Sequence, residues 1–165
     1  MNYSGIINCS IVDGDGFRVA LYVSGCKHGC NGCHNKETWD FKAGKEFTKE
    51  VEDILFDRLD KPYIKGLRLT GGDPLLNCDG ILPILKRFRE RYGNTKDVWL
   101  YTGFTIDEIM QSSDLKNKVV ELCDYIVDGK FDIEQKDTTL AFRGSRNQKI
   151  WEKTSENVLT LSSFN

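Results

Sequence analysis

The sequence has no long hydrophobic run and no leader-like start. No stretch approaches the roughly 18 consecutive apolar residues that a membrane-spanning helix needs. The first residues, Met1 to Gly5, lack the charged start and apolar stretch of a signal peptide. These absences predict a cytoplasmic protein with no membrane partner.

An excess of one charge is also missing. Lys and Arg together number 23 against 25 Asp and Glu, which gives a net charge of −2. Neither nucleic acid nor an anionic membrane is expected as a partner on this balance. The sequence shows no repeat, low-complexity segment or linker, and 165 residues suffice for one hydrophobic core. We therefore expect a single domain over residues 1–165.

Cysteine is not scarce, and half of it is clustered. Cys26, Cys30 and Cys33 form a C-x3-C-x2-C pattern within eight residues, separated by Lys, His, Gly and Asn rather than by apolar residues. The pattern is therefore not that of a buried core face. In a reducing compartment it indicates a metal site rather than a disulfide framework. The other three cysteines lie alone and are expected to be incidental thiols, namely Cys9, Cys78 and Cys123.

Two metals fit the cluster of cysteines. Cys30-x2-Cys33 has the spacing of a zinc knuckle, and His28 or His34 could complete a set of four ligands. Structural zinc sites usually take two separated pairs, however, and no second pair is present. A four-iron cluster ordinarily takes four cysteine thiolates, so three would leave one iron open for chemistry. The spacing of the cysteines allows both a zinc site and an iron–sulfur cluster, and we favour the iron–sulfur cluster.

Apolar periodicity predicts alternating strands and helices. Such alternation is typical of parallel strands covered by helices. Pro83 is expected in the first turn of the second helix, and Gly93 is expected to end that helix. Strands are expected over residues 5–11, 17–23, 66–70, 97–102, 125–127 and 158–161. The first two are separated by the turn Asp13-Gly14-Asp15-Gly16. Four helices are expected. The first begins at the cap Thr48 and has an apolar face of Val51, Ile54, Leu55 and Leu59, and the second has an apolar face of Ile81, Leu85, Phe88 and Tyr92. The third begins at the capping box Thr105-x-x-Glu108, and the fourth covers residues 115–122.

Three of these strands end in turns that contain glycine. The segments at these strand ends are Gly71-Gly72-Asp73, Tyr101-Thr102-Gly103 and Asp128-Gly129-Lys130. The cysteine pattern directly follows a fourth strand, over residues 17–23. The carboxyl ends of parallel strands meet at one edge, where α/β proteins place their sites. Each glycine alone could be a routine tight turn. Together they predict that backbone approaches a ligand closely at this edge.

A polar loop is expected at Phe142-Arg143-Gly144-Ser145-Arg146-Asn147-Gln148. Two guanidinium groups and two amides in seven residues suit recognition of a carboxylate, a phosphate or a peptide backbone. Simple solvation of the surface is an equally good interpretation.

Four blocks, taken in order, carry a resemblance to a known family. They are the segment from Gly25 to Asn35, Thr70-Gly71-Gly72-Asp73-Pro74-Leu75, Trp99-Leu100-Tyr101-Thr102-Gly103 and the polar loop 142–148. The cysteine pattern resembles the radical S-adenosylmethionine superfamily. All four blocks resemble, within it, the family of glycyl-radical activases that activate anaerobic ribonucleoside-triphosphate reductase.

The resemblance implies an α/β fold, a partial βα barrel with mostly parallel strands, and a [4Fe–4S] cluster on Cys26, Cys30 and Cys33. S-adenosylmethionine would chelate the fourth iron. One electron would cleave it to methionine and a 5′-deoxyadenosyl radical, which would abstract hydrogen from a glycine of the reductase and leave a glycyl radical. A one-electron donor such as reduced flavodoxin or ferredoxin is implied as well.

The resemblance also implies roles for individual residues. Gly71, Gly72 and Asp73 would hold the amino group of the cofactor, with Asp73 where the superfamily often has Glu. Gly32, Cys33 and His34 would face the adenine, and His28 is expected to be solvated. The residues expected near ribose and methionine are Tyr101, Thr102, Gly103, Asp128 and Lys130.

Length suggests how a protein substrate would reach the site. A complete eight-fold barrel takes about 200 residues or more, so this chain has room for only part of one. We expect the glycine-bearing loop of the reductase to enter the unclosed side, with Arg143, Arg146 and Asn147 as partner contacts. The alternatives are a radical enzyme that acts on another glycyl-radical enzyme or on a small substrate, and a zinc-binding interaction module.

Overall fold

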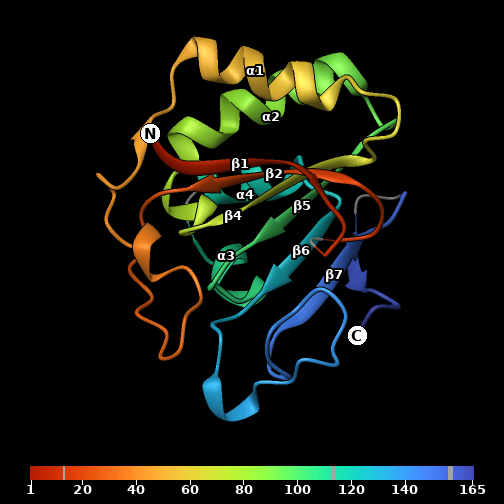
Figure 1. The fold of residues 1–165 in the computed structure, drawn as a ribbon. Coiled ribbons are helices and arrows are strands. Elements are labelled where there is room, and N and C mark those ends of the chain that lie inside the picture. Colours follow the sequence, from red (N-terminus) through yellow and green to blue (C-terminus); the bar gives the residue numbers. More distant parts are fainter. Residues whose placement is uncertain (13, 113, 156–157) are drawn as a thin grey trace.

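The strands of the described residues join one eight-stranded sheet in the order β3-β1-β2-β4-β5-β6-β7-β8 (Figure 1). The computed structural model describes residues 1–12, 14–112, 114–155 and 158–165, so Asp13 of the expected turn lies outside the described residues. The strands are β1 Asn2–Ser10, β2 Arg18–Val23, β3 Lys45–Glu46, β4 Gly66–Gly71, β5 Asp97–Tyr101, β6 Tyr125–Asp128, β7 Lys149–Lys153 and β8 Leu159–Leu161.

The four central strands of this sheet are parallel. β2, β4, β5 and β6 pair in that order, with Val23 opposite Gly71 at the carboxyl ends of β2 and β4. The pairs toward both ends, β3-β1-β2 and β6-β7-β8, are antiparallel. The expected parallel strands are therefore confirmed for the centre, whereas both margins are antiparallel. The periodicity missed β7, because only Ile150 of that strand is buried and most of its side chains are polar.

Alternation along the central strands gives the sheet two different faces. Leu67 and Leu69 of β4 belong to the main hydrophobic core, whereas Arg68 and Thr70 point to the opposite side. On β5, Leu100 joins the main core and Trp99 belongs to a second, smaller cluster with Val127 and Ile150. One face is therefore an apolar support, and the other carries polar and aromatic groups.

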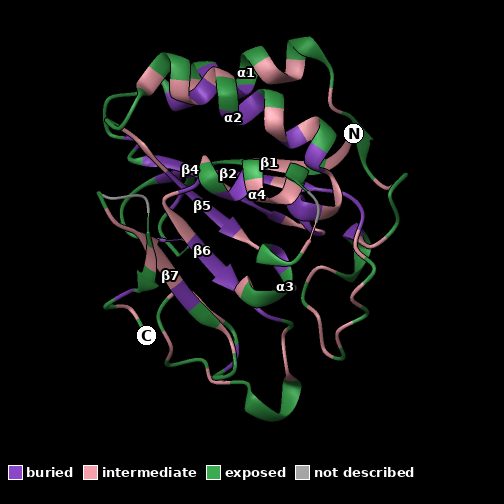
Figure 2. Ribbon diagram, turned by 180° about the vertical axis from the view of Figure 1, so that it is seen from behind, coloured by how far each residue is buried: buried purple, intermediate pink, exposed green. Residues whose placement is uncertain are grey.

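The helices supply the other half of the main core. α1 (Lys49–Leu59), α2 (Cys78–Tyr92), α3 (Ile106–Met110) and α4 (Asp114–Glu121) all contribute buried residues to the cluster that contains Leu67 and Leu69. In Figure 2 the buried colour lies on the inner sides of α1 and α2 and along β5 and β6. Among the described residues, no helix combines the length and apolar character needed to cross a membrane.

Helix boundaries follow the predicted caps, with two corrections. Thr48 accepts a hydrogen bond from Val51 N at 3.4 Å, and the capping box of Thr105 and Glu108 is present. The predicted apolar face of α1 was wrong at Ile54, which is 48% exposed, because the face turned to α2 includes Phe56 instead. Pro83 lies in the second turn of α2 rather than the first, because the helix already begins at Cys78. Gly93, with a φ of 53°, ends α2 as expected.

Candidate functional site

The cysteine loop is fixed at its start by the strand ends beside it. Gly72 N donates to Val23 O at 2.7 Å, and Asp73 N donates to Gly25 O at 2.9 Å. A Cβ on Gly72 would lie 2.5 Å from Gly25 O, and one on Gly71, whose φ is +97°, would lie 2.6 Å from Val23 O. Glycine is therefore required here so that β4 can approach the backbone of the cysteine loop. From the sequence we expected these glycines to let the backbone approach a ligand, or each alone to form a routine tight turn, and not to make room for the cysteine loop.

One cavity brings together the cysteine loop and the three predicted strand ends. It has a volume of about 130 Å³, and its lining includes all three clustered cysteines as free, half-buried thiols. The strand ends that also line it contribute Gly71, Gly72, Asp73, Thr102, Gly103 and Gly129. Residues that are far apart in the sequence thus meet at one edge of the parallel strands.

Each of these three sulfur atoms accepts a backbone hydrogen bond. Burial raises the pKa of the Cys26 thiol, and the hydrogen bond from the backbone of His28 opposes that rise. Burial likewise raises the pKa of Cys30, against a backbone hydrogen bond from Phe131 and the nearby charge of Lys130. Asn35 N donates to Cys33 Sγ at 3.4 Å. Hydrogen bonds to sulfur are among the features that tune iron–sulfur clusters, so this donor set fits such a group.

No tight single-ion site accompanies the thiols. Across the residues that the structure describes, no three His, Cys, Asp or Glu side chains are placed to hold one metal ion together. Cys78 and Cys123 are buried away from the cavity lining, and Cys9 is exposed on β1.

Asp73 is the most heavily bonded side chain of the cavity. Its carboxylate is 1% exposed, and its Oδ2 shares a hydrogen bond with His28 Nε2 at 2.5 Å. It also accepts from Thr102 Oγ1 at 2.9 Å, Gly103 N at 3.0 Å and Leu75 N at 2.8 Å. The carboxylate therefore joins the cysteine loop to the ends of β4 and β5.

The expectation that His28 is solvated was wrong. Its side chain is only 9% exposed and lies edge-on to Phe104 at 4.7 Å. A Cβ on Gly103 would lie 2.5 Å from the imidazole, so the ring occupies space that any other residue at that position would fill. The sequence held one signal for the burial of His28. A buried carboxyl group at a strand end needs hydrogen-bond partners, and His28 is one of only two histidines that could provide one.

The other predicted cofactor residues fall into two groups. Thr102 and Gly103 share the cavity with the cysteines and donate to Asp73, and Tyr101 O–H donates to Phe142 O at 2.9 Å. Asp128 is 4% exposed and accepts from Ile106 N at 2.8 Å and from Lys149 N at 3.2 Å, which ties α3 and β7 together. Lys130 is exposed on the segment beside Cys30. Their contacts with a cofactor stay predictions.

A segment that follows β6, residues 129–137, covers one side of the cysteine loop. A Cβ on Gly32 would lie 2.8 Å from Ile133, and the rings of His34 and Phe131 lie 5.9 Å apart. Together with the hydrogen bond from the backbone of Phe131 to Cys30, these contacts place the segment directly against the loop. No pattern in the sequence indicates this contact, because the segment has the composition of an ordinary polar connection.

The polar loop 142–148 holds this segment in place. Asn147 Nδ2 donates to Lys130 O at 2.8 Å, and Gln148 Nε2 donates to Gly129 O at 3.0 Å. Arg146 pairs with Asp137 at 2.9 Å. Hydrogen bonds from Thr139 and then Arg146 lower the pKa of Asp137 to about 2.

Arg143 belongs to the same loop. It donates to Gln148 O at 2.9 Å and to Asn165 Oδ1 at 2.6 Å. The three predicted partner contacts, Arg143, Arg146 and Asn147, thus all have partners within the chain. Of the two arginines, Arg146 has by far the more accessible position, with a side chain that is 73% exposed.

Comparison with known proteins defines the class first. A family model described as a 4Fe-4S single cluster domain matches residues 12–151, which is most of the chain. The chain therefore carries the sequence pattern of an iron–sulfur domain.

Curated relatives then define the family. A protein of Pasteurella multocida is 40% identical over 158 residues, covering 93% of this chain and 99% of the relative. One from Enterobacteria phage T4 is 41% identical and covers 93% and 96%. One from Escherichia coli K12 is 42% identical and covers 91% and 97%. Each is named anaerobic ribonucleoside-triphosphate reductase-activating protein, and this chain belongs to that family.

Proposed function

We propose that this protein is a radical S-adenosylmethionine activase that generates the glycyl radical of anaerobic ribonucleoside-triphosphate reductase. The observation that carries the proposal is the single cavity lined by Cys26, Cys30, Cys33 and three strand ends. The names of the relatives supply the partner, and the iron–sulfur family supplies the cofactor class.

In this proposal the three cysteines hold a [4Fe–4S] cluster with one iron left for S-adenosylmethionine. Once reduced, the cluster would supply one electron to cleave the sulfonium of the bound cofactor, so that one hydrogen atom would leave a glycine of the reductase and methionine and 5′-deoxyadenosine would be released. A one-electron donor such as reduced flavodoxin or ferredoxin restores the electron. The sheet, with its separate ends at β3 and β8, serves as a partial barrel in the cytoplasm.

The protein's own side chains have positioning tasks. Backbone N–H groups donate to the sulfur atoms of Cys26, Cys30 and Cys33 and so help to hold them in place for a cluster. Asp73 offers a buried carboxyl group beside them, whose oxygens suit the cofactor's amino group. Because Gly71 and Gly72 have no side chains, the end of β4 lies close to the cysteine loop, so that Asp73 and the cysteines line one cavity. The segment 129–137 covers Cys30 and Gly32 and so limits access of water on that side.

The first measurement is metal content. Protein purified anaerobically should hold about four irons and an equal amount of acid-labile sulfide per chain. Stoichiometric zinc without sulfide would instead support the interaction module.

The decisive measurement is electron paramagnetic resonance after anaerobic incubation with a reductant, S-adenosylmethionine and the reductase. An organic doublet on the reductase, formed only when all components are present, is the expected result. Formation of 5′-deoxyadenosine without any radical on the reductase would contradict the proposal and favour a small substrate.

A further inference from the structure

Two adjacent amide side chains connect the polar loop to the segment that covers the cysteine loop. Asn147 and Gln148 donate to two adjacent carbonyl oxygens, Lys130 O at 2.8 Å and Gly129 O at 3.0 Å. Both carbonyls belong to the start of the segment 129–137. The two amides therefore hold this segment at the point where it leaves β6.

The segment 129–137 depends on its hydrogen bonds for its position. All of its residues after Gly129 are exposed or half-buried. A segment with little buried apolar surface opens at a low cost in free energy, so its hydrogen bonds decide how often it opens. Asp132 N also donates to Ser145 Oγ at 3.2 Å, but the two amides hold the part of the segment that lies next to Phe131.

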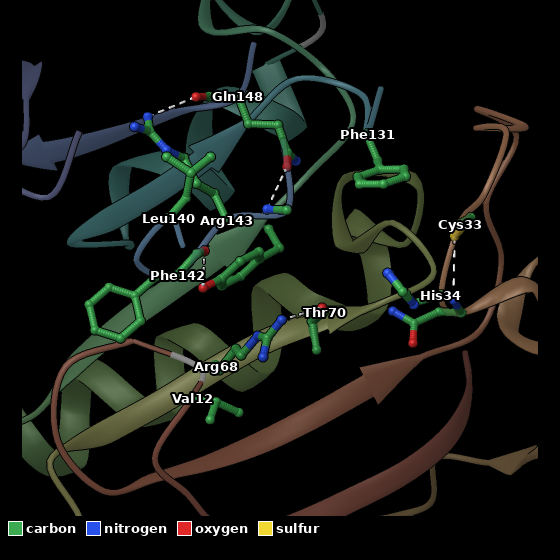
Figure 3. A pocket seen from close by; sticks show the side chains of 13 residues that line it. Val12, Cys33, His34, Arg68, Thr70, Phe131, Leu140, Phe142, Arg143 and Gln148 are labelled. Carbon is green, nitrogen blue, oxygen red and sulfur yellow. Dashed lines mark hydrogen bonds between the residues drawn. The ribbon is translucent and has the colours of Figure 1, made fainter. Parts of the chain in front are cut away.

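The closed segment covers the sulfur atom of Cys30. Phe131 directly follows the two bonded carbonyls, and its backbone N–H donates to this sulfur. Phe131 and Gln148 line the cavity of the cysteines and also a second cavity of about 340 Å³ on the polar face of the sheet. In Figure 3, Gln148 lies beside Arg143 and Phe131, across this second cavity from Arg68. Opening of the segment would remove the hydrogen bond to Cys30 and admit water to its sulfur.

The chemistry of an amide suits this connection. Oε1 of Gln148 accepts from Gly144 N at 3.1 Å and from Ser145 N at 3.2 Å, both within the polar loop, while Nε2 donates to Gly129 O. An amide carries an acceptor and a donor on one carbon, so it makes both sets of bonds at once. A carboxylate of the same shape would keep the acceptor, lose the donor and place a second oxygen against the Gly129 carbonyl. Exchange of one nitrogen atom for oxygen thus isolates the bond to the segment.

We propose that Asn147 and Gln148 are positioning residues that keep the segment 129–137 closed. The closed segment keeps the Phe131 N–H on the Cys30 sulfur and slows the loss of iron from a bound cluster. This inference rests on the proposed function, because it takes Cys30 as a ligand of the cluster. Replacement of groups that hold metal ligands in place commonly changes metal affinity by about 10–100-fold. Asn147 thereby has a role within the chain that differs from the predicted contact with the reductase.

The test uses protein whose cluster has been reconstituted anaerobically, and it follows removal of iron by the chelator bathophenanthroline disulfonate. Gln148→Glu and Asn147→Asp should each speed iron removal about fivefold or more, which is the effect of one lost hydrogen bond on an opening equilibrium. Asn147 is exposed, so its substitution disturbs no packed position. Gln111→Glu is the matched control, because Gln111 is exposed at the end of α3 and lies outside the lining of both cavities. It should lose iron at the rate of the wild type.

A second measurement separates positioning from a general loss of stability. In both variants without iron, amide hydrogen exchange measured by nuclear magnetic resonance should speed up about fivefold or more at Phe131. Exchange at Leu69 in the main core should match the wild type.

Unchanged iron removal in both variants, or exchange that speeds up equally at Phe131 and Leu69, would overturn the inference. Faster exchange at Phe131 without faster loss of iron would overturn it as well. Wild-type protein that takes up neither iron nor sulfide would instead overturn the proposed function.

Discussion

At the scale of single residues, the buried carboxylate of Asp73 links the parts of the site. Its donors come from three separate segments, the cysteine loop, the turn after β4 and the end of β5. His28 is separated from Asp73 by 45 positions in the sequence, so no local pattern could reveal the pair. The absence of a side chain at Gly103 makes room for the imidazole. Gly103 and His28 therefore contribute to the docking of the cysteine loop, beside the backbone contacts at the end of β4.

Replacing His28 tests this linkage. His28→Ala should lower the free energy of unfolding of the iron-free protein by about 2 kcal/mol, because a hydrogen bond to a buried charge is lost. Denaturant unfolding under anaerobic, iron-free conditions measures it without interference from the metal. The control is His34→Ala, whose ring has a single aromatic contact at 5.9 Å and should change stability by less than about 0.5 kcal/mol. Equal effects of the two substitutions would show that the Asp73 bond does not anchor the loop.

At the scale of elements, the carboxyl ends of β2 and β4 determine where the cysteines lie. The two strands run parallel from Arg18 opposite Gly66 to Val23 opposite Gly71, and the cysteine loop leaves β2 directly after this pairing. Gly72 then donates to Val23 O, which extends the pairing by one more hydrogen bond. Hence the position of the loop depends on how closely the end of β4 can approach it.

Gly72→Ala tests that approach. The added Cβ would meet Gly25 O at 2.5 Å, so the cysteine loop must move away from β4. We expect iron and sulfide content after reconstitution to fall by half or more while the circular dichroism of the fold is retained. Gly5→Ala is the control, because a Cβ there meets nothing within 4 Å, and its iron content should match that of the wild type. Normal iron loading in Gly72→Ala would mean that the loop tolerates the displacement.

At the scale of the whole molecule, the sequence predicted what depends on local patterns. Strand and helix alternation gave the parallel centre, because Leu67 and Leu69 repeat every second residue and the cap at Thr48 is a local hydrogen bond. The missed features are long-range ones. β7 joins the sheet by pairing with β6, and the segment 129–137 covers the cysteines through contacts that no period encodes. The gathering of the cysteines with three strand ends followed from parallel topology alone.

The separation of core and site at this scale leads to a last prediction. None of the clustered cysteines belongs to the main hydrophobic core, which lies between the sheet and the helices. Cys33→Ala should therefore change the free energy of unfolding of the iron-free protein by less than about 1 kcal/mol. Reconstituted Cys33→Ala should nevertheless lack the cluster, its visible absorption and the radical on the reductase, because two thiolates cannot replace three.

Cys9→Ala is the matched control, because Cys9 is an exposed thiol on β1 that does not line the cavity of the cysteines. It should keep full iron content and radical yield. A Cys33→Ala protein that still yields the radical would remove Cys33 from the ligand set. A Cys33→Ala protein that fails to fold without iron would instead show that the cysteine loop stabilises the fold, and that the hydrophobic core and the cysteine site are not independent.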